Sequence, residues 1–240
     1  MGSAVESLPV RILLVGHGRV GRLIERLAPE YECEVAGIID SRSALGGESG
    51  PVDRDRWGPV DVAIDFSTPS AVAVNVPALA RRGINMVVGT TGWQKDEQAV
   101  RTAVEARGVG IVAAANCSTG VVILEVVAAQ AASLFARQAE FGAWIHEAHH
   151  AAKKDAPSGT ALMLKRTMAE AGFARPIDVS STRAGHNPGA HTIGFDGPAE
   201  SFTMSHTARD RSTFARGALL AARWVKGRRG WFTMRDVLGL

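Results

Sequence analysis

The sequence has little of what marks secreted, metal-binding or membrane proteins. It contains two cysteines, Cys33 and Cys117, which lack metal-ligand spacing and favour a reducing, cytoplasmic setting. The first residues lack the apolar core of a signal peptide. The longest apolar runs, residues 109–115 and 120–129, are too short or too interrupted to cross a bilayer. We therefore expect a cytoplasmic protein with no membrane partner.

A strong charge of one sign is also absent. The 27 basic and 24 acidic side chains leave a net charge of only +3, and most basic residues are scattered along the chain. Because nucleic-acid-binding surfaces gather basic side chains, we expect no nucleic-acid partner. A cleft for a small anionic substrate explains the positive excess equally well.

The first half of the chain alternates apolar runs with helical patterns. Residues 10–15, 34–39, 61–66, 84–88 and 109–115 predict strands, and residues 19–27, 70–82 and 96–107 predict helices. This alternation is typical of an α/β fold with a parallel, doubly wound sheet.

The pattern changes after residue 116. Residues 121–135 and 158–171 predict helices around a strand at 140–149. Residues 177–208 hold short alternating runs broken by glycine, proline and asparagine, which suggest antiparallel strands. A helix at 213–225 and a short strand at 231–234 follow. We expect an inserted α+β domain with a mostly antiparallel or mixed sheet, and a last helix that returns to the first domain.

A glycine-rich turn follows the first predicted strand. Gly16, Gly18 and Gly21 have GxGxxG spacing, and Asp40 ends the next predicted strand. The separation of about 20 residues suits dinucleotide binding, in which the glycines allow a tight turn, close approach of the pyrophosphate and close packing of helix and strand. Asp40 would accept hydrogen bonds from the adenosine ribose. A plain tight turn with a capping aspartate is the alternative.

The choice between NADH and NADPH stays open at this stage. Asp40 favours NADH, whereas Arg19 and Arg42 could meet the extra phosphate of NADPH. Three further loops follow predicted strands at the sheet edge where open α/β sheets bind ligands, although ordinary loop and capping roles are the alternative. The expected cofactor contacts are Gly16, Gly18, Arg19, Val20, Gly21, Asp40, Phe66, Ser67, Gly89, Thr90, Thr91, Ala115, Asn116 and Cys117.

The most informative segment is residues 147–160, which combines histidines, lysines and a predicted helix start. N–H groups at a helix start bind anions, lysines bind carboxylates, and histidine can pass a proton near neutral pH. The segment therefore predicts a site for a small acidic substrate that gains or loses a proton. Its members are His149, His150, Lys153, Lys154, Ser158, Gly159 and Thr160.

Together these motifs resemble those of the dihydrodipicolinate reductase family, and the match covers nearly the whole chain. Segment 147–160 is highly specific to that family. The other matching segments, besides the glycine turn, are residues 65–69, 88–92, 115–118, 183–191 and 206–215.

The resemblance implies an NADH- or NADPH-dependent reductase of lysine and diaminopimelate biosynthesis. Hydride would go to ring carbon 4 of dihydrodipicolinate, a cyclic dicarboxylate formed from 4-hydroxy-tetrahydrodipicolinate, and would give tetrahydrodipicolinate. His149 matches the proton donor, and Lys153 matches the residue that assists it and binds substrate. The remaining matches are His150, Ser158, Gly159 and Thr160 as contacts of the substrate carboxylates, and Arg211 near the nicotinamide.

The same resemblance implies the domain organisation. Residues 1–118 and 212–240 would form a Rossmann-type dinucleotide-binding domain, and residues 119–211 a substrate-binding and tetramerisation domain. The expected assembly is a homotetramer built largely through the sheets of the second domain. The chemistry agrees, because hydride addition to a conjugated imine leaves a carbon that must be protonated by an acid.

Several positions depart from the family pattern. Cys117 stands where an aromatic residue is common, Val122 where asparagine is usual, the first two glycines are closer together, and residues 41–60 form a short connection. Two alternatives therefore stay open: a related dehydrogenase acting on another small acid, and a cofactor-binding sensor without catalysis. The presence of His149 and Lys153 argues against the sensor.

The other histidines allow fewer conclusions. His146 alternates with Glu147 and is expected to face away from the motif. His191 and His206 suit either structural or substrate-site roles. A metal site from Glu147, His149 and His150 has suitable residue types, but adjacent histidines on a strand point to opposite faces, so no metal is expected.

Overall fold

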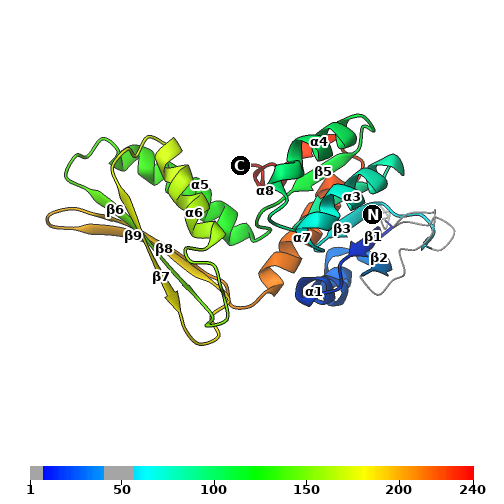
Figure 1. Ribbon diagram of the computed structural model, residues 1–240, viewed down its shortest axis with the longest axis horizontal. Helices are drawn as coiled ribbons and strands as arrows, with labels where there is room; N and C mark the ends of the chain where they lie inside the picture. Colours follow the sequence, from blue (N-terminus) through cyan, green and yellow to red (C-terminus); the bar gives the residue numbers. More distant parts are fainter. Residues whose placement is uncertain (1–7, 41–56) are drawn as a thin grey trace, which may run out of the picture. The chain divides into compact units, whose positions relative to one another are not determined.

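The computed structural model describes residues 8–40 and 57–240 and divides the chain into two compact units (Figure 1). The first unit combines Met1–Cys117 with Phe214–Leu240, and the second is Ser118–Thr213. The second unit is thus continuous in sequence and interrupts the first. Arg42, expected near a cofactor phosphate, and most of the connection at 41–60 lie outside the described residues.

The first unit is built on a six-stranded parallel sheet with the order β10-β5-β4-β3-β1-β2. The order turns at β1, which pairs with β2 on one side and β3 on the other. The expected doubly wound α/β fold is confirmed. Its strands are β1 (Val10–Val15), β2 (Cys33–Ile39), β3 (Val62–Asp65), β4 (Asn85–Val88), β5 (Gly110–Ala113) and β10 (Gly230–Phe232).

Helices pack on this sheet because the strands are apolar on both faces. Buried side chains such as Leu13, Leu79, Met86 and Ile111 form one continuous core. The helices are α1 (Arg19–Leu27), α3 (Pro69–Arg81), α4 (Glu97–Glu105), α7 (Ser212–Val225) and α8 (Met234–Leu238), with short 3-10 turns η1 (Ala28–Tyr31) and η2 (Gln94–Asp96).

One expected boundary of the first unit is wrong. Residues 231–234 were expected as strand, but β10 ends at Phe232 and helix α8 begins at Met234. Thr233 and Asp236 form a capping box, in which each side chain bonds the other residue's backbone. This local exchange of hydrogen bonds starts the helix.

The second unit holds a mixed sheet with the order β7-β6-β8-β9. β6 (Gly142–His149) is antiparallel to β8 (Ala190–Asp196), which is antiparallel to β9 (Ser201–Thr207). β7 (Ile177–Arg183) instead runs parallel to β6, so the antiparallel expectation fails for this strand. The reason is helix α6 (Gly159–Glu170), which supplies the long crossover that a parallel pair needs.

Two helices, α5 (Thr119–Phe135) and α6, lie on one face of this sheet (Figure 1). Their buried side chains meet Ile145, Ile193 and Phe195 from the strands. The opposite face carries the half-buried Trp144 and exposed hydroxyl residues such as Thr203. We call it the open sheet face.

Within residues 8–40 and 57–240, none of the helices is both long and apolar enough to cross a lipid bilayer.

Candidate active site

A cavity of about 480 Å³ lies in the first unit, at the carboxyl ends of β1, β2 and β3. This is the edge where ligands bind to open α/β sheets. Five expected cofactor residues line it: Gly16, Gly18, Asp40, Phe66 and Ser67. Thr68, from the expected loop at residues 65–69, also lines it, as do Arg22 and Asn75, which were not expected. Arg22 lies one helical turn beyond Gly18 on α1, a spacing that could have indicated it.

The three glycines of the turn after β1 meet different demands. Gly16 has a φ of 93°, and a Cβ there would lie 2.4 Å from the carbonyl oxygen of Phe66. A Cβ on Gly21 would lie 2.3 Å from the carbonyl oxygen of Gly16. A Cβ on Gly18 would meet nothing within 4 Å. Gly16 and Gly21 are therefore required by packing, whereas Gly18 leaves open space at the start of α1, which suits a pyrophosphate.

Asp65, at the end of β3, joins two of the expected cofactor loops. Its buried carboxylate accepts hydrogen bonds from the Ser67 backbone N–H at 2.9 Å and the Thr90 hydroxyl at 2.9 Å, and Asn75 donates to its other oxygen at 3.1 Å. The aromatic ring of Phe66 packs against Gly89, where a Cβ would be 2.2 Å from the ring. The loops after β3 and β4 are thus fixed to each other by Asp65 and Phe66.

The remaining expected cofactor residues lie outside the cavity lining: Arg19, Val20, Gly21, Gly89, Thr90, Thr91, Ala115, Asn116, Cys117 and Arg211. Cys117 is buried, and burial raises the pKa of its thiol to about 12. Arg211 belongs to the second unit, where its guanidinium lies 3.5 Å from Nε2 of His150.

The second unit gathers buried polar side chains at the carboxyl end of β6. Strand alternation places Glu147 and His149 on the helix-covered face with Ile145. His146 lies on the open sheet face, as expected, and its Nδ1 is 2.9 Å from the Ser180 hydroxyl. The antiparallel register sets His191 of β8 opposite Glu147. The cluster therefore contains Glu147, His149 and His191.

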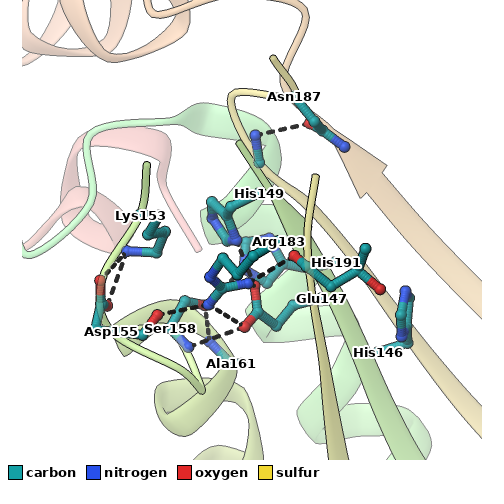
Figure 2. Close-up of polar contacts among 12 residues, drawn as sticks. His146, Glu147, His149, Lys153, Asp155, Ser158, Ala161, Arg183, Asn187 and His191 are labelled. Atoms are coloured by element: carbon teal, nitrogen blue, oxygen red, sulfur yellow. Dashed lines mark hydrogen bonds and ion pairs between the residues drawn. The ribbon is translucent and has the colours of Figure 1, made fainter. Parts of the chain in front are cut away.

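Arg183, at the end of β7, completes this cluster (Figure 2). Its two terminal nitrogens donate to the two carboxylate oxygens of Glu147 at 3.0 and 2.7 Å. Burial alone would raise the pKa of Glu147, but hydrogen bonds from Arg183, Ser181 and His149 outweigh it and lower this pKa to about 2. Glu147 is therefore a buried, ionised carboxylate whose charge is paired.

Burial also determines the state of the two histidines. It lowers the pKa of His149 below the usual value, an effect that the neighbouring Glu147 opposes and the cations of Lys153 and Arg183 increase. Burial, with the nearby His149, lowers the pKa of His191 to about 4. Both imidazoles are therefore neutral at neutral pH in the ligand-free protein.

Ser158 is the N-cap of α6, and its polar groups bond within the protein. Its N–H donates to Glu147 at 3.2 Å, and its hydroxyl oxygen accepts from the N–H of Ala161 at 3.2 Å and lies 3.2 Å from Nε2 of His191. The residues that present the helix start outward are Gly159, which is exposed, and Thr160, which is half-buried. Ser158 thus holds the helix start against the buried cluster.

The lysine expected in the site has an acidic partner. The ammonium group of Lys153 donates to both carboxylate oxygens of Asp155, at 2.7 and 2.8 Å (Figure 2). The side chain of Asp155 is 58% exposed, so the pair is solvated and easily exchanged for another carboxylate.

Metal ligation has candidate residues in this cluster. Glu147, His149 and His191 offer ligand atoms within 4.8 Å of one another, so His191, rather than His150, is the third group nearby. Both oxygens of Glu147 already bond to Arg183, whose guanidinium provides the positive charge at this place. A cation would have to displace Arg183, and we assign no metal.

Comparisons with known proteins agree with this geometry. The family model described as dihydrodipicolinate reductase, N-terminus, matches residues 10–117, and the model for the C-terminus of the same family matches residues 120–238. The 4-hydroxy-tetrahydrodipicolinate reductase of Rhodopseudomonas palustris (strain TIE-1) is 36% identical over 268 residues, covering 96% of this chain and 98% of the relative. The enzyme of that name from Caulobacter vibrioides is 37% identical over 255 residues, covering 97% and 98%.

A solved structure shows the same fold. The dipicolinate-bound dihydrodipicolinate reductase from Paenisporosarcina sp. TG-14 superposes with a TM-score of 0.79 at 22% identity, covering 95% of this chain and 98% of that one. With both family models together spanning nearly the whole sequence, the chain belongs to the dihydrodipicolinate reductase family.

Proposed function

We propose that this protein is the 4-hydroxy-tetrahydrodipicolinate reductase of lysine and diaminopimelate biosynthesis, which reduces dihydrodipicolinate to tetrahydrodipicolinate with NADH or NADPH. The observation that carries the proposal is the second unit's cluster. It combines a buried imidazole, His149, with the cation of Lys153 and the start of helix α6. A cyclic dicarboxylate that must be protonated on carbon needs such a set.

The first unit supplies the residues for the cofactor. The open space at Gly18 suits the pyrophosphate, and Asp40 suits the adenosine ribose. Arg22, which lines the same cavity, adds a cation that suits the extra phosphate of NADPH. When bound, the nicotinamide supplies the hydride for ring carbon 4. We assign Phe66, Ser67, Gly89, Thr90, Thr91, Ala115, Asn116, Cys117 and Arg211 to the rest of the cofactor site on the family resemblance.

The second unit supplies the proton and the anion contacts. His149 donates the proton, with Lys153 assisting. Lys153 exchanges its pair with Asp155 for a substrate carboxylate, and the N–H groups of Gly159 and Thr160 receive the other. His150, beside Arg211, adds a polar contact. The two substrate carboxylates raise the pKa of His149 on binding, because nearby negative charge favours the imidazolium.

The open sheet face of the second unit is our proposed homotetramer surface. Thr192 and Ser205 are hydrogen-bonded across its strands at 3.0 Å, and Trp144 lies over Gly194. A mass of four chains by light scattering supports this assembly, and a monomer rejects it. We place the enzyme in the cytoplasm, since both cysteines are free thiols.

Activity is tested by oxidation of NADH or NADPH with the unstable substrate generated in situ by its synthase. Oxidation that depends on the synthase is expected. The variant His149→Gln should lose about 100-fold or more in kcat, because an acid contributes about 100- to 10,000-fold. His186→Gln, at an exposed loop position, is the control and should be unchanged. Undiminished turnover in His149→Gln would mean that another group donates the proton.

A further inference from the structure

Glu147 has no part in the proposed chemistry, yet it is the most enclosed charged residue of the cluster. Its side chain has no exposed surface, and strand alternation points it inward beside His149. A buried carboxylate is costly unless cations and donors satisfy it. Two contacts from Arg183, one from the N–H of Ser158, one with His149 and one from the side chain of Ser181 do so.

The contact with His149 determines which ring nitrogen can exchange a proton. Nδ1 of His149 hydrogen-bonds to Oε2 of Glu147 (Figure 2). An ionised carboxylate only accepts hydrogen bonds, so Nδ1 carries the hydrogen in neutral His149. Nε2 is then the atom that gains a proton and gives it away.

The neighbourhood of Nε2 fits this assignment. A Cβ on Gly189 would lie 3.0 Å from Nε2 of His149, and Gly189 has a φ of 152°. A side chain at position 189 would therefore crowd the reactive nitrogen. Gly189 places no side chain against Nε2.

Arg183 connects this pair to the lysine. One terminal nitrogen that bonds Glu147 also donates to the backbone carbonyl of Asp155 at 2.6 Å. Asp155 in turn holds Lys153 through its carboxylate. One guanidinium therefore fixes the carboxylate behind His149 and the loop that carries Lys153.

We propose that Glu147, fixed by Arg183, is a positioning residue that holds His149 in the Nδ1–H tautomer and presents Nε2 to the substrate. The proposal rests on His149 being the proton donor. In the step, the Nε2–H bond of the imidazolium breaks as a C–H bond forms at the electron-rich ring carbon of the reduced substrate. Nδ1 keeps its hydrogen, Glu147 stays ionised throughout, and solvent returns a proton to Nε2.

The test is Glu147→Gln in the full-length enzyme. We expect kcat to fall about 10- to 100-fold, a part of what an acid contributes, with little change in KM. The charged groups facing His149 are Glu147 on its own strand, Arg183 on β7, Lys153 on the following loop and His191 on β8. Among them only Glu147 favours the imidazolium. Its loss should therefore lower the pKa of His149, and the pH above which kcat declines should shift to a lower value.

A matched control is Glu125→Gln. Glu125 lies in the same unit and accepts a hydrogen bond from Thr167 at 3.1 Å, outside the cluster. It should keep wild-type kcat and pH dependence. If Glu147→Gln fails to fold, Arg183→Lys keeps the cation but loses the two-pronged contact, and a smaller fall in kcat is expected, with a rise in KM because the loop of Lys153 also loses its contact with Arg183.

Nitrogen NMR of His149 in the wild-type enzyme tests the same idea without any variant. The neutral imidazole should carry its hydrogen on Nδ1, and a spectrum showing the hydrogen on Nε2 overturns the proposal. The proposal is also overturned if Glu147→Gln has the same kcat and the same pH dependence of kcat as the wild-type enzyme. If His149→Gln retains full activity, the proposed proton donor is wrong. If His149→Gln is inactive while Glu147→Gln behaves as wild type, only the positioning role fails.

Discussion

Gly16 and Gly18 lie two residues apart but should respond differently to the same substitution. Gly16→Ala forces a Cβ against the Phe66 carbonyl and strains a positive φ, so the free energy of unfolding should fall by about 1–3 kcal/mol or more. Gly18→Ala meets no protein atom and should leave stability unchanged. It should instead weaken NADH or NADPH binding, because its methyl group enters the space that we assign to the pyrophosphate.

Thermal unfolding and a fluorescence titration with the reduced cofactor separate the two effects. Equal loss of stability in both variants would contradict the packing argument for Gly16. Undiminished cofactor affinity in Gly18→Ala would move the pyrophosphate away from the start of α1.

The sequence predicted residues of the site that share a short segment and missed those that arrive from elsewhere. His149 and Lys153 are recognisable because one motif contains both. Arg183 and His191 reach Glu147 only through the register of β7 and β8 with β6. No local spacing encodes a strand register, so their contacts with Glu147 were not predictable. Asp65 was likewise visible only as part of a loop motif.

At the scale of elements, the short last helix, α8, tests whether its capping box is needed to stabilise it. Thr233→Ala removes one half of the capping box of α8 and should lower the free energy of unfolding by about 1 kcal/mol. Thr102→Ala is the control, since Thr102 is exposed on α4 and its hydroxyl only bonds the Gln98 carbonyl at 2.9 Å. Urea unfolding compares them, and equal small effects would show that packing of Met234 and Val237 suffices without the cap.

Elements of the first unit were predictable because their strands are short, apolar runs that alternate with helical patterns. Strand β7 was predicted in place but not in direction. Its residues alternate like those of an antiparallel strand, and one face is exposed. Direction depends on the path of α6 over the sheet, which is a tertiary property.

For the whole molecule, the buried histidines predict sensitivity to acid. The pKa of His191 is lowered to about 4 by burial, so the fold favours its neutral form. That stability is present above the ordinary value of about 6.5 and is lost as the pH falls towards 4. His149 and His206 shift in the same direction, and the contribution of Glu147 is lost below about pH 4.5.

We expect His191 alone to cost about 2 kcal/mol of unfolding free energy between about pH 7 and pH 5. Urea unfolding at both pH values measures it. His191→Gln, which keeps a hydrogen-bonding group for the Ser158 hydroxyl, should flatten this dependence, whereas His186→Gln at its exposed loop position should retain it. The same slope in both variants would show that His191 does not govern it.

The insertion of the second unit has a consequence for synthesis on the ribosome. Residues 118–213 are one uninterrupted stretch and can fold as soon as they emerge. The first unit cannot be completed then, because β10, which borders β5, and most of α7, whose Gly217 packs on the Cys117 backbone, belong to the last residues translated. Until those residues arrive, the edge of β5 lacks its neighbouring strand. The first unit is therefore begun first and finished last, and the second unit can be complete while the first still lacks its edge strand.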